Sequence, residues 1–124
     1  MTVEILKLPL PNGALSPNAR PNRFMKAAAT KNARTTARRE VYRLYKEWDF
    51  PSGFVIISLK YVAYWKTKGK KKDDVNLLAS CKAYEDGIQD AVSQDDSTWS
   101  LEQPEHRFDP DNPRLEVHIN IEEL

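Results

Sequence analysis

The pattern of apolar and polar positions begins with a short extended segment. Residues 3–10, VEILKLPL, are largely apolar, and Pro9 and Pro11 close the run. Proline cannot donate to a strand ladder, so we predict a first strand that ends at these prolines. The residues that follow, 11–23, PNGALSPNARPNR, are rich in Pro, Asn and Gly, which is typical of a loop.

A long helix is predicted from about Asn22 to Trp48. Ala37, Val41, Leu44 and Trp48 recur at spacings of four, three and four, so they share one face that we expect to be buried. The rest of the helix surface is basic, and taken alone this indicates a solvated face. Its cations include Lys31, Arg34, Arg38, Arg39 and Arg43.

The middle of the chain predicts a central strand and a second helix. Residues 53–65, GFVIISLKYVAYW, are β-branched and aromatic on both faces, as in a strand covered on two sides. A basic loop follows, and a helix is predicted from about Asn76 to Val92. The predicted core side of this helix carries Leu77, Cys81, Tyr84, Ile88 and Ala91.

Two further strands complete the pattern. We predict one at 99–107 and one at 114–122, where apolar and polar residues alternate and His118 falls on the polar face. The order is β-α-β-α-β-β within a single domain, residues 1–124. This predicts an α+β (mixed α/β) fold in which two helices pack on a mixed sheet of about four strands.

Composition fits one ordinary globular domain. The 124 residues are 40% hydrophobic and 30% charged, which is enough for one core. The single cysteine, Cys81, excludes an internal disulfide and fits a reducing compartment, and we interpret it as a buried hydrophobe. We see no signal peptide and no run of about 20 apolar residues that could span a membrane, so we expect a cytoplasmic protein.

The net charge of +1 conceals two oppositely charged halves. Residues 1–72 carry 16 Lys or Arg and 4 Asp or Glu, whereas residues 73–124 carry 3 and 14. A basic half indicates a polyanionic partner such as nucleic acid, and an acidic cluster beside it indicates a divalent metal. The alternative is that the two halves attract each other as salt-bridged faces.

Two aspartate pairs flank the second predicted helix. Asp73 and Asp74 precede it, and Asp95 and Asp96 follow it. The ends of such a helix lie about 25 Å apart, so the pairs share one metal only if the chain folds back. Acidic pairs at helix ends also act as caps and solvated turns, and this alternative stays open.

The segment KDDVNLLASCKAYEDGIQDAVSQDDS, residues 72–97, resembles the signature of the RusA family of Holliday junction resolvases. That signature is Asp-x-Asp-Asn-Leu-Leu-Ala, a Lys four residues before Asp-Gly, and then Asp-Asp-Ser. Its elements here are Asp73, residues 76–79, Lys82, Asp86-Gly87 and residues 95–97. Residues 15–20, LSPNAR, also resemble the N-terminal loop of the family. The predicted β-α-β-α-β-β order fits the family as well, so the resemblance extends over nearly the whole chain.

The resemblance implies a Mg²⁺-dependent homodimer, with Mn²⁺ as a second candidate metal, that nicks opposed strands of four-way junction DNA. It implies that Asp73 and Asp96 are metal ligands and that Asp95 lies beside them. Asp74 is a further candidate ligand, and Lys82 would lie near the scissile phosphate. The expected DNA contacts are Lys70, Lys71, Lys72, Arg20, Arg34 and Arg38.

Val75 departs from the family pattern, which has aspartate at this position. Valine offers no oxygen to a metal. Three explanations follow: Asp74 takes over the role, the substitution disables the nuclease, or the chain binds branched DNA without cutting it. Neighbouring helical residues point about 100° apart, so simple replacement by Asp74 requires a segment that is not helical.

We therefore expect a structure-selective endonuclease that acts on Holliday junctions in DNA recombination and repair. The alternative is a catalytically impaired relative that binds branched DNA. A third hypothesis is a small RNA-binding or protein-interaction domain whose charge blocks pair internally. The sequence alone identifies neither the general base nor the cleavage preference.

Overall fold

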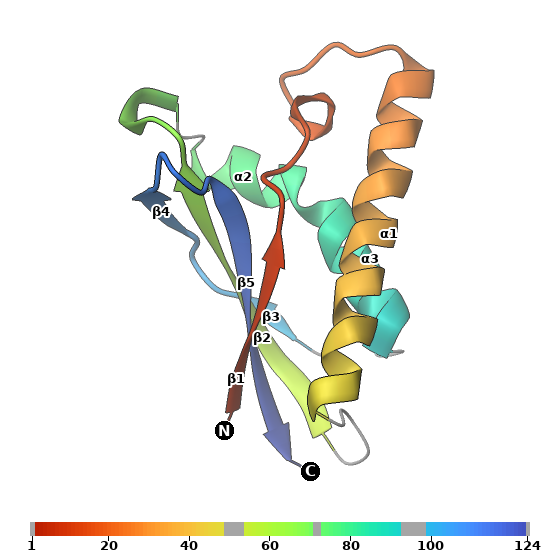
Figure 1. The fold of residues 1–124 in the computed structure, drawn as a ribbon. Helices are drawn as coiled ribbons and strands as arrows, with labels where there is room; N and C mark the ends of the chain where they lie inside the picture. The colour runs from red at the N-terminus through yellow and green to blue at the C-terminus, as the bar shows by residue number, and fades with distance from the viewer. Residues whose placement is uncertain (1, 49–53, 71–72, 93–98, 124) are drawn as a thin grey trace.

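The computed structural model describes residues 2–48, 54–70, 73–92 and 99–123, and within these ranges the chain forms an α+β fold, as predicted (Figure 1). Three helices pack with a mixed five-stranded sheet. In chain order the elements are β1 (Thr2–Leu8), the 3-10 turn η1 (Gly13–Leu15), α1 (Arg23–Trp48), β2 (Phe54–Trp65), the 3-10 turn η2 (Lys68–Lys70), α2 (Asp74–Ser80), α3 (Lys82–Val92), β3 (Ser100–Leu101), β4 (Glu105–Phe108) and β5 (Arg114–Glu123).

The sheet has β1 at one edge and β2 in its interior. β5 lies between β1 and β2 and is antiparallel to both, whereas β3 and β4 run parallel to β2 along its other side. The prediction of a central strand at 53–65 is therefore confirmed over Phe54–Trp65, and residue 53 lies outside the described ranges. Three consecutive β2 residues, Tyr61, Val62 and Ala63, are buried, which shows that the strand is covered on both faces at this point.

The strand predicted at 99–107 is divided into β3 and β4. Both pair with β2, at Ser58–Leu59 and at Val62–Trp65 respectively. Pro104 lies between them and has no N–H to donate, so the ladder is interrupted there. The sheet thus has four strand positions across its width, and one of them is filled by two short strands.

A register shift in β2 decides which side chains reach the core. Between Ile56 and Ser58 the pairing with β5 skips one residue, so Ile57 is the extra residue of a β-bulge. Leu59 and Tyr61, which follow the bulge, lie on the core side of the strand. Ile56, which precedes the bulge, lies on the same side. All three are buried.

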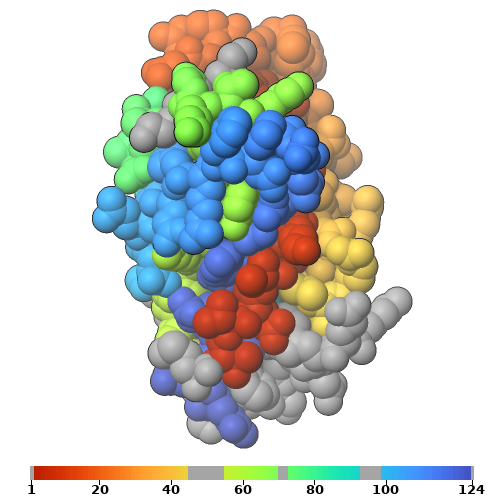
Figure 2. Space-filling model, turned by 60° about the vertical axis from the view of Figure 1, so that its left-hand side comes forward, coloured from red at the N-terminus to blue at the C-terminus, as the bar shows by residue number. Residues whose placement is uncertain are grey.

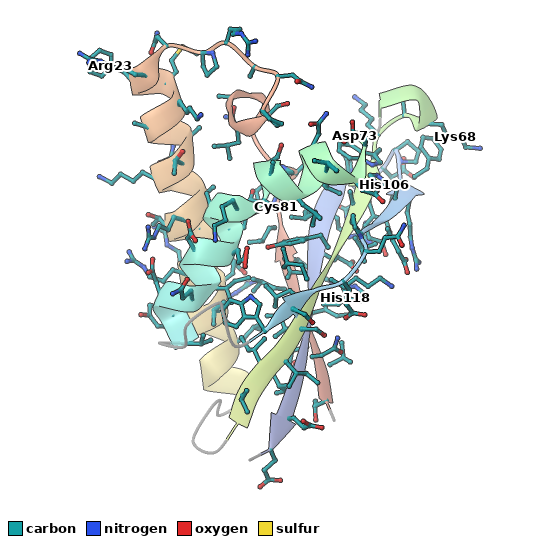
Figure 3. The ribbon with its side chains drawn as sticks, turned by 180° about the vertical axis from the view of Figure 1, so that it is seen from behind. Arg23, Lys68, Asp73, Cys81, His106 and His118 are labelled. Atoms are coloured by element: carbon teal, nitrogen blue, oxygen red, sulfur yellow. The ribbon has the colours of Figure 1, made fainter. Side chains whose placement is uncertain are left out.

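The helices cover one face of this sheet. Figures 1 and 3 show α1 and α3 lying side by side, with α2 crossing at the end of the molecule opposite both termini. Ala37 and Val41 of α1 are buried as predicted, and Ala29 and Ala33 extend this face. The alanines allow a close approach: a Cβ at Gly87 of α3 would lie 2.2 Å from the carbonyl oxygen of Arg34.

The single helix predicted from 76 to 92 is wrong in one respect, because the helix is interrupted at Cys81. The backbone N–H of Cys81 is shared between the carbonyls of Leu77 and Leu78, both 3.1 Å away, which tightens the turn. α3 then changes direction and runs beside α1. The core positions predicted for the helix, including Leu77 and Ile88, are all buried.

The face of the sheet away from the helices carries paired charges. Glu105 of β4 binds Lys60 of β2 and Arg107 on its own strand. Glu116 of β5 is buried and binds Arg114 and His118. Figure 2 shows the β4–β5 region, in blue, covering the upper part of this side of the molecule. Of these contacts only Lys60–Glu105 joins the basic half of the chain to the acidic half, because Arg107, Arg114 and His118 belong to the same half as their partners.

Within the described ranges, no helix combines the length and the apolar character that crossing a bilayer requires.

Candidate functional site

The acidic pair lies where α2 begins. Asp73 is the N-cap of the helix: one carboxylate oxygen accepts the backbone N–H of Asn76 at 2.8 Å, and the other accepts its side-chain amide at 3.0 Å. The Asp-x-x-Asn spacing of the motif therefore has a structural role, since capping stabilises a helix by about 1 kcal/mol. The same contacts hold the Asp73 carboxylate in one place at an exposed corner, labelled in Figure 3.

Asp74, the first residue of α2, contacts β4 instead. Its carboxylate lies 2.7 Å from Nε2 of His106, and Gln103 donates to its other oxygen at 3.4 Å. These contacts attach the start of α2 to the sheet edge. They bring together two residues that the sequence analysis did not connect, and His106 was not among the expected site residues.

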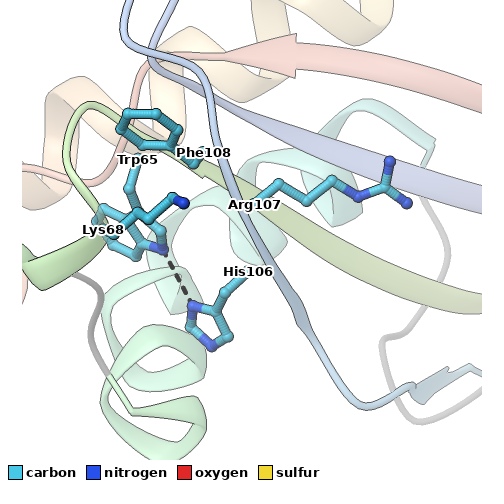
Figure 4. Close-up of a pocket in the computed structure, with 5 residues that line it drawn as sticks. All are labelled: Trp65, Lys68, His106, Arg107 and Phe108. Atoms are coloured by element: carbon cyan, nitrogen blue, oxygen red, sulfur yellow. Dashed lines mark hydrogen bonds between the residues drawn. The ribbon is translucent and has the colours of Figure 1, made fainter.

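His106 is held on both ring nitrogens. The indole N–H of Trp65 donates to its Nδ1 at 3.0 Å, shown as the dashed line in Figure 4. Tryptophan is a donor only, so Nδ1 carries no proton, and the Nε2–H is the group that donates to Asp74. The two rings also stack, with an interplanar angle of 12°. Trp65, His106 and Asp74 thus form a continuous chain of hydrogen bonds from the sheet to the acidic pair.

Val75 lies on the helix and points into solvent. It is 77% exposed, and the segment is helical from Asp74 onward. Consecutive helical residues point about 100° apart, and the Asp74 carboxylate is directed toward His106. The first explanation for Val75, replacement by Asp74, required a segment that is not helical. Because the segment is helical, the structure does not support this explanation. The other two explanations stay open.

Lys82 lies on the first turn of α3, beyond α2. Its ammonium is 3.3 Å from Asp86 and 3.7 Å from Glu85. α2 has seven residues and so separates Lys82 from the start of that helix by about 10 Å. Lys82 also borders a hollow of about 290 Å³ with Lys26 of α1 and Asp86.

Glu85 is a buried acid that the sequence analysis missed. It is only 7% exposed, and the indole N–H of Trp99 donates to it at 3.2 Å. No local sequence signal distinguishes Glu85 from an exposed helical glutamate.

The hydroxyl of Tyr61 is buried without a hydrogen-bond partner among the described residues. Burial raises the pKa of Tyr61 well above its ordinary value, and electrostatic interactions with Cys81 and Glu85 raise it further.

Several expected site residues fall outside the described ranges. These are Asp95, Asp96, Lys71 and Lys72, together with the side chain of Lys70. Within the described part of the chain, no group of three or more His, Cys, Asp or Glu side chains is arranged to hold a metal. Asp73 and Asp74 supply carboxylate oxygens, the donor type that Mg²⁺ prefers, and Mg²⁺ often uses only one or two carboxylates from protein.

The expected DNA-binding arginines differ in their surroundings. Arg34 forms a two-pronged ion pair with Asp90 of α3, at 2.6 and 2.8 Å. The hydrogen bond from Arg34 lowers the pKa of Asp90. Arg20 and Arg38 are exposed. Arg34 is therefore engaged in joining α1 to α3, whereas Arg20 and Arg38 face solvent.

The start of α1 is strongly basic. From Arg20 to Arg39 the chain has seven Lys or Arg residues, and the first acid of α1 is Glu40. Figure 3 shows Arg23, at the start of α1, at the same end of the molecule as Asp73 and Lys68. We call the start of α2, with Asp73 and Asp74, the acidic corner. Cations from α1 and from η2 thus lie on either side of the acidic corner.

Comparison with known proteins adds one relative. No family model matches the chain. It is 37% identical over 95 residues to a protein of Xylella fastidiosa (strain Temecula1 / ATCC 700964) described as "Uncharacterized protein". The match covers 76% of this chain and 61% of that protein, so the chain spans less than two thirds of the length of this relative. This similarity assigns no activity to the chain, because the description of the relative names none.

Proposed function

We propose that this chain is a RusA-like Holliday junction resolvase, a metal-dependent endonuclease that binds four-way DNA junctions as a homodimer inside a bacterial or phage-infected cell. The observation that carries the proposal is the acidic corner at the start of α2. There Asp73 and Asp74 are held in fixed orientations between the basic start of α1 and the basic turn η2. A polyanion drawn to these cations meets carboxylates that need a divalent metal beside phosphate.

The proposed roles of Asp95 and Asp96 follow the resemblance to the RusA family, and those of the other residues also rest on their positions in the described part of the chain. Asp73, with Asp95 and Asp96, is the candidate ligand set for Mg²⁺, and Asp74 is a further candidate. Bound Mg²⁺ would polarise a phosphoryl oxygen and lower the pKa of a bound water. Asn76 orients Asp73 through two hydrogen bonds, and His106 orients Asp74 through one. Lys82 contributes positive charge one short helix away.

DNA binding in this proposal is mainly electrostatic. Arg20 and Arg38 face solvent, and Lys68 lies on η2 near the acidic corner. Contacts of this kind release counterions, so we expect junction affinity to fall steeply as salt increases. Arg34 is a weaker candidate because Asp90 already neutralises part of its charge.

A specific observation favours the alternative, a relative that binds branched DNA but cuts it poorly. Val75 projects into solvent from the first turn of α2, where the family pattern has a carboxylate. With Asp74 directed at His106, no described side chain takes over that position. This alternative keeps the DNA contacts and removes one metal ligand.

The test is cleavage of a labelled synthetic four-way junction in Mg²⁺ by this chain and by V75D, with V75N as the matched control. Because Val75 is exposed, all three chains should fold alike. Cleavage by V75D alone supports the impaired relative, since only aspartate restores a charged oxygen ligand. Cleavage by the unmodified chain supports the active resolvase. If no chain cuts the junction or binds it more tightly than linear duplex, the proposal is overturned.

A further inference from the structure

A small pocket adjoins the acidic corner and belongs to no role assigned so far. It has a volume of about 250 Å³ and is formed where the end of β2, the turn η2 and the strand β4 meet (Figure 4). This volume lies a little below the roughly 300 Å³ at which pockets for drug-sized ligands begin, so it suits one small flat group. Its walls are Trp65, Lys68, His106, Arg107 and Phe108.

The pocket offers an exposed aromatic ring and a cation that lies over it. Phe108 is 46% exposed, and the ammonium of Lys68 lies 5.7 Å from its ring centroid. Among the described residues Lys68 forms no ion pair, whereas Arg107 binds Glu105 at 2.8 Å and extends away from the other four side chains. Trp65 is only 8% exposed and donates to His106. Trp65 and His106 therefore form a fixed wall, and Phe108 and Lys68 are the groups available to a ligand.

The chemistry of these groups fits a nucleotide. A base stacks on an exposed aromatic ring, and the neighbouring phosphate is attracted to an ammonium. Bases inside a duplex are stacked on each other, so only an unpaired nucleotide can present its face to Phe108. The wall residue His106 contacts Asp74 at 2.7 Å, which places such a nucleotide next to the acidic corner.

We infer that this pocket binds one unpaired nucleotide of DNA, with the base stacked on Phe108 and its phosphate held by Lys68. The identity of the polyanion as DNA rests on the proposed function, whereas the preference for an unpaired base rests on the pocket. Unpaired bases occur at strand exchange points and at single-stranded ends. The pocket would thus direct branched or frayed DNA toward Asp73 and Asp74.

The test measures the affinity of a fluorescein-labelled thymidine oligomer and of a linear duplex by fluorescence anisotropy, without Mg²⁺. F108A should weaken binding of the oligomer about tenfold, the loss expected for one stacked base, and should change duplex binding little. K68A should weaken both. The matched control is F24A: Phe24 is 72% exposed and also lies beside a cation, Arg23, at 4.9 Å, but it lines no part of this pocket.

The outcomes separate this inference from the proposed function. A loss of oligomer binding in F108A but not in F24A supports the pocket, even if four-way junctions are neither bound nor cut. An equal loss in F24A, unchanged binding in F108A, or no binding of the oligomer by the unmodified chain overturns the inference, even if junctions are cut. Thermal unfolding of each variant confirms that it is folded, and F108L, which keeps an apolar side chain without a ring, should bind as weakly as F108A.

Discussion

The carboxylate of Asp74 lies 2.7 Å from Nε2 of His106, a residue 32 positions further along the chain. This contact joins the first turn of α2 to the parallel edge of the sheet. The opposite ring nitrogen accepts the indole N–H of the largely buried Trp65. The orientation of one member of the acidic pair is therefore set by the core of the protein and does not depend on a bound ligand.

Replacing His106 should destabilise the protein. H106A removes the acceptor of the Trp65 indole N–H and leaves a buried donor unpaired, which costs about 1–3 kcal/mol. Urea unfolding followed by circular dichroism measures this change. The matched control is Q103A, because the contact of Gln103 with Asp74 is long, 3.4 Å, and exposed. We expect Q103A to stay within about 0.5 kcal/mol of the unmodified chain. Equal stability of H106A and Q103A would show that the hydrogen-bonded chain contributes nothing.

Gly87 should resist substitution for a reason unrelated to metal binding or DNA. A Cβ at this position would lie 2.2 Å from the Arg34 carbonyl oxygen and 2.9 Å from the Ala37 Cβ. G87A should therefore lower stability by about 1–3 kcal/mol through overpacking, although alanine is by itself about 1 kcal/mol better in a helix. The control is G69A, where a Cβ meets nothing within 4 Å. A G87A variant more stable than the unmodified chain would contradict the close helix approach.

Local periodicity was sufficient to predict the main elements. The predicted apolar face of β5 is buried, and on the predicted face of α1 Ala37 and Val41 are buried, Leu44 is partly buried and the side chain of Trp48 lies outside the described residues. These positions depend only on spacing along one element, so the sequence contains the information. The interruption at Pro104 was missed, because one strand was predicted across 99–107 although proline cannot donate to a strand ladder.

The candidate site was predictable only in part. The motif located Asp73 and Asp74, but the partner of Asp74 depends on the parallel pairing of β4 with β2. Periodicity does not determine which strands pair, so His106 was not connected to the site and only His118 was considered. The interruption at Cys81 is a further example, since it separates Lys82 from the acidic pair by a change of helix direction that spacing alone does not reveal.

Two buried tyrosines should respond in opposite ways to loss of their hydroxyls. The Tyr84 hydroxyl donates to the Pro9 carbonyl at 2.8 Å, and burial raises its pKa to about 12. Y84F should therefore lower the free energy of unfolding by about 1 kcal/mol, the net contribution of one hydrogen bond. The Tyr61 hydroxyl has no partner among the described residues, so Y61F should be neutral or stabilising. Urea unfolding of both variants tests the pair. A greater loss for Y61F than for Y84F would contradict this assignment.

The ion pairs on the face of the sheet away from the helices should make stability depend on pH. Hydrogen bonds from Lys60 and then Arg107 lower the pKa of Glu105 from 4.5 to about 2. A carboxyl with a lowered folded-state pKa stabilises the protein above its unfolded-state pKa and loses this contribution as the pH falls. E105Q should thus be less stable than the unmodified chain above pH 4.5, and the difference should shrink between pH 4.5 and 2. Urea unfolding at several pH values measures it. E122Q is the control, because Glu122 is exposed and forms no ion pair among the described residues. A similar pH-dependent difference for E122Q would show that the effect is not specific to Glu105.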